Sequence, residues 1–155
     1  MAVGDLSYNA SNNKPSATLV KHYFTFSWDV LADATTYLRR FRLPFLGRLS
    51  DIQMSLDVTG TDGTDVEVDV QDDTVSMLST LPAMTVAAAD DLVIATGDGA
   101  VTGTVVPIIN TAVDTPAENS VILVSVLADG TFTVQPSGLV VTLEFVEQQN
   151  FNPTA

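Results

Sequence analysis

From residue 17 onward, apolar and polar residues alternate with a period of two, the pattern of β-strands that bury one face. The segments DIQMSLDV and VEVDVQ alternate cleanly, with Ile52, Met54, Leu56 and Val58 on the buried face of the first. Near the C-terminus, GLVVTLEFVE alternates over its whole length, and its apolar positions are Leu139, Val141, Leu143 and Phe145. The chain is therefore expected to be built from strands, with these side chains in its core.

Clusters of Gly, Asp, Asn and Pro separate the alternating segments. In TGTDGTD, residues 59–65, the Asp62–Gly63 pair tolerates positive φ, and ADG at residues 128–130 is predicted to form a hairpin turn. No segment carries a long apolar stripe with the 3.6-residue period of a helix. About eight short strands separated by turns predict an all-β fold, a single antiparallel β-sandwich of jelly-roll type.

The alternation divides the chain into two parts. Residues 1–16 are rich in Asn, Ser and Ala without periodicity, so they are predicted to form an extended N-terminal arm, with the sandwich over residues 17–155. A single domain of this length buries about 68–70% of the surface that its unfolded chain exposes. The strongest apolar run, SVILVSVLA at residues 120–128, is too short to span a bilayer and is expected to be a buried strand. The start of the chain lacks the basic and apolar regions of a signal peptide, so a soluble protein is expected.

The charge is distributed unevenly along the chain. The net charge is −13, which opposes binding to nucleic acid and to anionic membranes, so neither is expected as a partner. Residues 1–48 hold all 6 Lys and Arg residues against Asp5, Asp29 and Asp33, a balance of +3, and the remainder holds the other 16 acids and no base. Such asymmetry indicates that the two parts of the chain face different surroundings.

Four arginines lie in the segment YLRRFRLPFLGRL, residues 37–49. Two interpretations are open: this segment lies against the acidic body of its own molecule, or it contacts a neighbour. Arginine and aromatic residues are enriched in protein–protein interfaces, which favours the second interpretation.

A head-to-tail contact between the basic strand of one copy and the acidic face of the next would close a ring, most economically a homotrimer. The arm, residues 1–20, is expected to reach an adjacent subunit. The residues predicted to contact a neighbouring subunit or a partner surface are Lys14, Lys21, Arg39, Arg40, Arg42, Phe45 and Arg48.

Enzymatic chemistry finds little support in the sequence. The absence of cysteine excludes disulfides and zinc–thiolate sites. The single histidine, His22, lies among aromatic residues of a strand, which is typical of a structural histidine. The segment GDGAVTG, residues 97–103, lacks the lysine of a phosphate-binding loop, and the single Trp28 is a thin platform for stacking a sugar. No catalytic residue and no cofactor are therefore assigned.

The densest acidic segment is DGTDVEVDVQDD, residues 62–73, in which Glu67 and Asp69 lie on the same strand face. Two interpretations are open: a calcium site, or a solvated acidic edge that prevents strand-to-strand aggregation. The spacing does not match the twelve-residue calcium loop, so the solvated edge is favoured and no metal is assigned.

The stretch RFRLPFLGRLSDIQMSLDVTGTDGTDVEVDVQDDTVSML resembles a domain common among structural proteins of tailed bacteriophages. The matching parts are a Leu-Pro segment at residues 43–44 followed by Gly47, an alternating strand at 52–58, an apolar-Asp strand at 66–70, and a closing strand at 138–145. The chain departs from the family in having QDDT where an Asn-Gly turn is usual, and AADDL where Gly-Asp is usual. The resemblance spans residues 37–146 and implies a jelly-roll β-sandwich, often trimeric, of the kind found in head decoration (cement) proteins and in fibre or tail proteins.

The resemblance and the charge asymmetry together predict a non-enzymatic virion structural protein. It is expected to be made in the host cytoplasm and to decorate the exterior of a phage head, with the major capsid protein and other copies of itself as partners. The alternative is a fibre or tail-associated receptor-binding domain that recognises a glycan or protein on the host surface.

Overall fold

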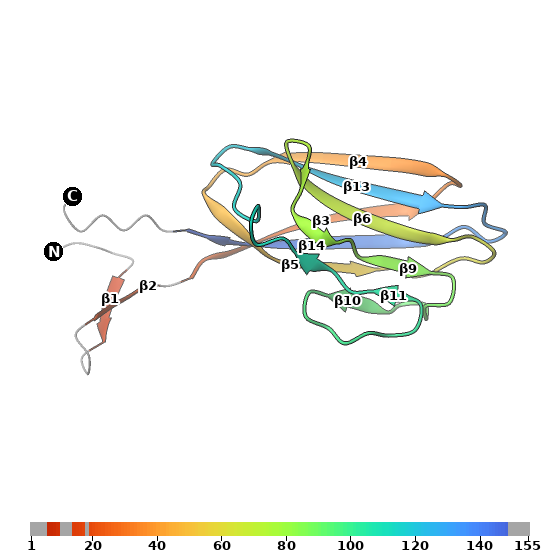
Figure 1. The fold of residues 1–155 in the computed structure, drawn as a ribbon, viewed down its shortest axis with the longest axis horizontal. Helices are drawn as coiled ribbons and strands as arrows, with labels where there is room; N and C mark the ends of the chain where they lie inside the picture. The colour runs from red at the N-terminus through yellow and green to blue at the C-terminus, as the bar shows by residue number, and fades with distance from the viewer. Residues whose placement is uncertain (1–5, 10–13, 18, 149–155) are drawn as a thin grey trace.

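The chain folds as an antiparallel β-sandwich, in which two sheets face each other across the core (Figure 1). The structure is a computed structural model that describes residues 6–9, 14–17 and 19–148, with side chains from residue 19 onward. Its strands are β1 (Leu6–Asn9), β2 (Lys14–Ala17), β3 (Lys21–Val30), β4 (Thr35–Arg42), β5 (Gly47–Ser55), β6 (Asp65–Asp72), β7 (Val75–Ser76), β8 (Leu78–Thr80), β9 (Ala83–Thr85), β10 (Val93–Ala95), β11 (Thr104–Val105), β12 (Ile108–Ile109), β13 (Val121–Asp129) and β14 (Ser137–Glu147). The prediction of an all-β antiparallel sandwich is confirmed.

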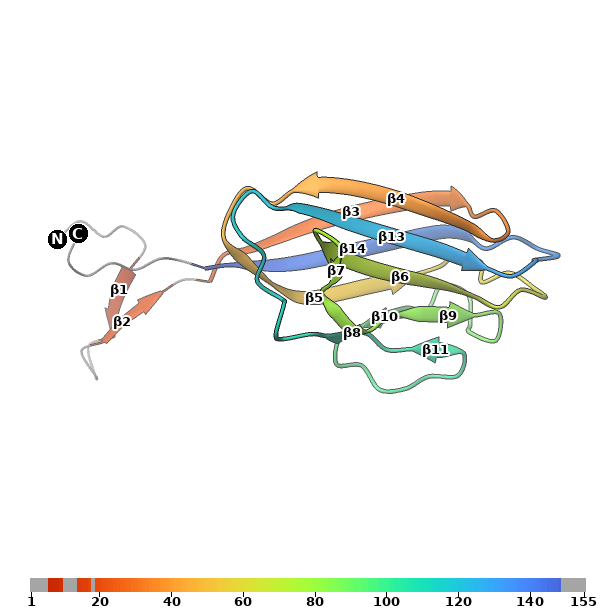
Figure 2. The ribbon, with the colours of Figure 1, turned by 45° about the horizontal axis from the view of Figure 1, so that its top comes forward.

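The strand order places the long strands β13 and β14 inside the two sheets, each with a neighbour on both sides. The four-stranded sheet has the order β10-β5-β14-β3, and the six-stranded sheet has the order β11-β9-β6-β13-β4, with β7 paired to β6. Two further pairs, β1-β2 and β12-β8, lie outside these sheets. The edge strands β3 and β4 follow each other in the chain and lie side by side on one side of the sandwich (Figure 2).

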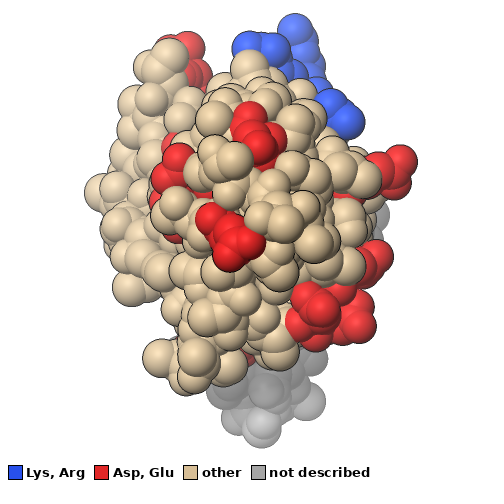
Figure 3. Space-filling model, turned by 90° about the vertical axis from the view of Figure 1, so that its right-hand side faces the viewer, with Lys and Arg blue, Asp and Glu red and all other residues tan. Residues whose placement is uncertain are grey.

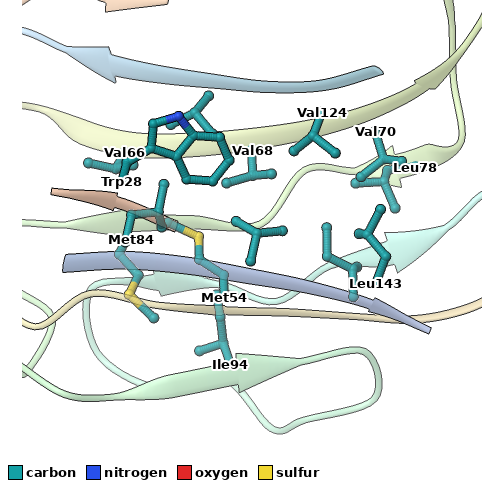
Figure 4. Close-up of a cluster of buried hydrophobic side chains, with 14 of the residues drawn as sticks. Trp28, Met54, Val66, Val68, Val70, Leu78, Met84, Ile94, Val124 and Leu143 are labelled. Carbon is teal, nitrogen blue, oxygen red and sulfur yellow. The ribbon is translucent and has the colours of Figure 1, made fainter. Parts of the chain in front are cut away.

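The core is filled by the inward side chains that the alternation predicted. Figure 4 shows valines of β6 and β13 packed toward Met54 of β5 and Leu143 of β14. The inward residues of the last strand are fully buried, as are Ile52, Met54 and Leu56, whereas Val58 is half-buried because β5 has already ended. This confirms the core predicted from the sequence on these strands.

The predicted hairpin turn at residues 128–130 is wrong. Gly130 has a φ of 98°, as a turn glycine should, but the chain then crosses from β13 in the six-stranded sheet to β14 in the four-stranded sheet. Between the two strands, Phe132 is buried against Gly63, where an added Cβ would lie 2.1 Å from the ring. The segment therefore closes one end of the core instead of returning beside β13.

The segment GTVVPII, residues 103–109, has the composition of one strand but forms two short strands on either side of Pro107. β11 joins β9 in the six-stranded sheet, and β12 pairs with β8. Proline has no backbone N–H to donate to a ladder, which explains the break. Among the described residues there is no helix long and apolar enough to cross a membrane.

Candidate assembly surface

Strand β4 presents its arginines on both of its faces. Arg39 shares the inward face with Tyr37 and Phe41, and its guanidinium carbon lies 5.3 Å from the ring centroid of Trp28 on β3. At this distance the cation interacts favourably with the aromatic face. Arg39 therefore covers the open side of the core, where the edges of the two sheets meet, rather than pointing away from it.

Arg40 and Arg42 point outward from the six-stranded sheet. Their neighbours across the ladder are Leu123 and Val121 of β13, which offer no charge. Among the described residues, the ion pairs involve Lys21 and His22, and no arginine takes part in one. The first interpretation of the basic segment, in which it is neutralised by the acidic body of its own molecule, finds no ion pair here to support it.

Lys21 and Arg48 lie on the outer face of the other sheet. Both are register partners of Val146 in β14, Lys21 from β3 and Arg48 from β5. The amine of Lys21 lies 3.4 Å from Glu144, and the hydroxyl of Ser50 donates a hydrogen bond of 2.8 Å to the same carboxylate. Partial burial alone would raise the pKa of Glu144, but hydrogen bonds from Ser50, Tyr23 and Lys21 outweigh it and the pKa is lowered. The basic residues predicted to form one surface are thus divided between the two sheets.

Phe45 belongs to an aromatic cluster on the open side of the sandwich. Its ring stacks on His22 at a centroid distance of 4.1 Å and lies 6.5 Å from Phe24. The Nε2 atom of His22 donates a hydrogen bond of 2.9 Å to Glu147. Phe45 is half-buried, so most of its contact area is already taken by its own molecule. Lys14 begins β2, and its side chain lies outside the described part of the chain, as does much of the predicted arm.

The outward side chains of β6 form an acidic strip. The pKa of Glu67 is raised because the carboxyl is partly desolvated and lies near Asp65, Asp69 and Asp129. The pKa of Asp65 is raised by desolvation and by Asp129. Asp69 accepts hydrogen bonds from Ser76 and Gln71 at 2.5 and 2.7 Å. No group of three potential metal ligands occurs among the described residues.

The two kinds of charge are segregated on the surface. Viewed from the end that is on the right of Figure 1, Lys and Arg side chains gather at the top, the side on which β4 lies, whereas Asp and Glu side chains are scattered over the rest (Figure 3). On this face the positive charge is therefore concentrated at one side.

Comparison with known proteins finds a distant structural likeness. No protein-family model matches the chain, and no curated protein matches it. Among solved structures, the chain is similar to one described as the cyanophage Pam1 capsid asymmetric unit, with a TM-score of 0.46 and 10% sequence identity, over 92% of this chain and 99% of that chain. The likeness is too distant to say what this chain does, so its function has to be inferred from its own residues.

Sequence reasoning missed the apolar character of the outer face beside Arg40 and Arg42. Leu38, Val121 and Leu123 all point outward there, and Leu38 and Val121 are 42% and 46% exposed. The signal was present in SVILVSVLA, which is apolar on both faces of β13, although the six-stranded sheet covers the core on one face only. Apolar residues on both faces of a sandwich strand, here interrupted only by Ser125 on the outer face, are typical of a strand that is covered on both sides.

Proposed function

We propose that this chain is a non-enzymatic virion structural protein that decorates the outside of a phage head. The observation that carries the proposal is the pair Arg40 and Arg42, which stand outward from an acidic protein without an ion-pair partner among the described residues. Exposed guanidinium groups beside apolar side chains suit a protein partner, because they bind carboxylates through two hydrogen bonds at once. The sequence resemblance over residues 37–146 supports a phage structural protein in particular.

The proposed role is mechanical. Each copy would bind the major capsid protein and bridge neighbouring subunits, adding contact area that resists the outward pressure of packaged DNA. The net charge of −13 keeps the protein soluble and away from nucleic acid. In this proposal Lys21 and Arg48 contact the capsid from the outer face of the four-stranded sheet, and Lys14 and the arm contact an adjacent subunit.

Self-association is part of the proposal, in one of two closed forms. A homotrimer is the smallest ring that a head-to-tail contact closes, and a two-fold pair is the closed form of a contact that uses the same patch on both copies. We also propose that the sandwich is of jelly-roll type. In support, the long strands β3, β4, β5 and β6 alternate between the two sheets, and β13 and β14 do the same at the end of the chain.

Attachment to heads tests the proposed function. Phage heads that lack this protein are mixed with the purified chain, and bound copies are counted by quantitative gel analysis and located by electron microscopy. The proposal expects saturable binding to the shell, weakened at least tenfold by Arg40→Glu plus Arg42→Glu. A control variant of equal net charge carries Glu at four exposed positions near β10 and β11, namely Ala87, Ala89, Ala100 and Thr102, and should bind as the wild type does.

The location of the protein decides between the two functions expected from the sequence. Copies spread over the shell support decoration. Copies confined to the tail or to fibre tips overturn it in favour of the receptor-binding alternative.

A further inference from the structure

The outer face of β4, β13 and β6 is more apolar at its centre than a solvated sheet face should be. Leu123 and Leu127 of β13 point outward with Ser125 between them, and Leu38 of β4 adjoins Ser125 across the ladder. Antiparallel sandwich strands that face water normally alternate between apolar and polar residues. Here the alternation is lost on the middle strand, so this face has the composition of a covered surface.

Opposite charges are concentrated at two corners of this face, and Asp69 continues the acidic strip of β6 to the row of Ser125 between them. The basic corner consists of Arg40 and Arg42 on β4, which pair with Leu123 and Val121 of β13. The acidic corner consists of Asp65 and Glu67 on β6, which pair with Asp129 and Leu127 at the other end of β13. At about 3.4 Å per residue, the rows of Arg40 and Glu67 are about 14 Å apart along β13, and the outer strands are about 10 Å apart across it. The corners are therefore diagonally opposed, and the row of Ser125 lies midway between them.

We infer that this face binds a second copy of the chain about a two-fold axis that passes near Ser125, so that the basic corner of each copy lies on the acidic corner of the other. A two-fold axis that lies in the plane between the two faces, perpendicular to the diagonal that joins the corners, exchanges the two corners. Both charge contacts then form at once, and the two β13 strands cross each other near Ser125, with Leu123 and Leu127 on either side of the crossing. Facing sheets pack about 10 Å apart, a distance that arginine side chains and carboxylates bridge from opposite sides.

The relief of the face is consistent with this arrangement. A shallow hollow of about 220 Å³ is lined by Arg40, Gln71, Asp73, Thr74, Val121 and Leu123. It offers space beside Arg40 for side chains of the partner, although the carboxylate of Asp73 lines the same hollow. A second copy is favoured over another protein because this one face supplies both members of each charge pair.

This inference rests on the proposed function for its biological setting, but it makes a separate claim. It assigns the acidic corner as the partner of Arg40 and Arg42, and it selects the two-fold pair over the ring of three. A protein that binds heads as a monomer or a trimer would leave the proposed function standing and would overturn the inference.

Charge reversal of both corners tests the inference. The mass of the full-length protein is measured by sedimentation equilibrium over a range of concentrations and salt. The wild type is expected to be a dimer whose dissociation constant rises at least tenfold in high salt, because the contacts are ionic. Arg40→Glu plus Arg42→Glu should raise the dissociation constant at least 100-fold, and Asp65→Arg plus Glu67→Arg should do the same.

The quadruple variant that carries both reversals is the decisive species. Its charge pairs are restored in the opposite sense, so it should dimerise within about tenfold of the wild type, whereas loss of folding cannot restore an interface. The control variant with Glu at residues 87, 89, 100 and 102 should dimerise normally. Circular dichroism shows whether each variant is folded, and Leu123→Ser, which changes no charge, tests the apolar centre if a reversal variant does not fold. A monomeric wild type, a folded quadruple variant that stays monomeric, or a Leu123→Ser variant with unchanged affinity would each overturn the inference.

Discussion

Replacing Phe41 by alanine should destabilise the sandwich without changing what its surface binds. Phe41 lies between Arg40 and Arg42 in the chain but points inward, where its ring stacks on Phe24 at 4.5 Å and meets Phe145 edge-on at 6.3 Å. Truncating a fully buried phenylalanine costs about 3–5 kcal/mol, so the half-buried ring should contribute roughly 2 kcal/mol by burial. The stacked pair adds about 1 kcal/mol. The expected loss of unfolding free energy is thus about 3 kcal/mol.

The single tryptophan gives a direct assay for this loss. Trp28 lies on β3 with 6% of its surface exposed, so its fluorescence reports exposure of the core during urea unfolding. A change of about 3 kcal/mol corresponds to a fall in melting temperature of roughly 6–12 °C for a chain of this size. The measurement is made at two protein concentrations, because association of the native chain would raise its apparent stability.

Two matched variants separate the two faces of β4. Phe41→Leu keeps an apolar side chain and should lose about half as much stability, roughly 1.5 kcal/mol. Arg40→Ala should change the unfolding free energy of the dilute protein by about 0.5 kcal/mol or less, because the residue is exposed and unpaired. Two results would refute the assignment of stability to the inner face of β4 and of binding to its outer face. One is a loss of unfolding free energy below 1 kcal/mol for Phe41→Ala, and the other is a loss for Arg40→Ala in dilute solution as large as that for Phe41→Ala.

Three further predictions concern titration and backbone geometry. The carboxylate of Asp33 accepts hydrogen bonds from the backbone N–H of Phe132 and from the side-chain amide of Gln135, and these bonds lower its pKa from the usual 3.8. Their stabilising effect is therefore present above about pH 4 and is lost as the pH falls through the lowered pKa. Urea unfolding should show Asp33→Asn less stable than the wild type at pH 7, and the difference should shrink as the pH falls below 3.8; a constant difference would contradict this. Gly103→Ala should lower the free energy of unfolding by about 3 kcal/mol or more, because φ is 76° and the new Cβ would lie 2.3 Å from a backbone nitrogen. Gly97→Ala, where φ is 87° and the space is open, should lower it by only about 1 kcal/mol, and thermal melts of both variants measure the difference. Desolvation and the nearby Asp129 raise the pKa values of Asp65 and Glu67 in the free chain. The dimer should therefore begin to dissociate at a higher pH than the usual carboxyl pKa values of 3.8 and 4.5 would allow. Sedimentation at stepwise lower pH would show no such early onset if these carboxylates did not contact a partner.

The sequence predicted which residues of each strand point into the core better than it predicted which strands pair with one another. Period-two alternation is a local property, so the inward positions of β6 and β14 and the opposite orientations of Arg39 and Arg40 could be predicted without knowing the partners of the strands. Pairing between sheets depends on contacts between distant residues. For that reason the sequence could not show that Arg48 enters the sheet opposite to Arg40, nor that residues 131–136 cross the end of the core instead of forming a hairpin.

For the candidate surface too, the sequence showed local features but not which strands lie side by side. The charge asymmetry was visible as a count along the chain, and among the described residues the arginines of β4 take part in no ion pair. The acidic corner could not be identified in advance among the other acids, because its relation to Arg40 depends on both β4 and β6 pairing with β13. The signal that the sequence did offer is the apolar residues on both faces of β13, because burial inside a single molecule accounts for only one of these two faces.

The central position of β13 and β14 has a consequence for synthesis. Both sheets are completed only when the last strands arrive, and the hydrogen bond between His22 and Glu147 joins residues 125 positions apart in sequence. Contacts of such long range form slowly, and a ribosome that has translated only as far as residue 120 holds neither β13 nor β14. The nascent chain therefore cannot present a finished docking face until both of these strands have been synthesised.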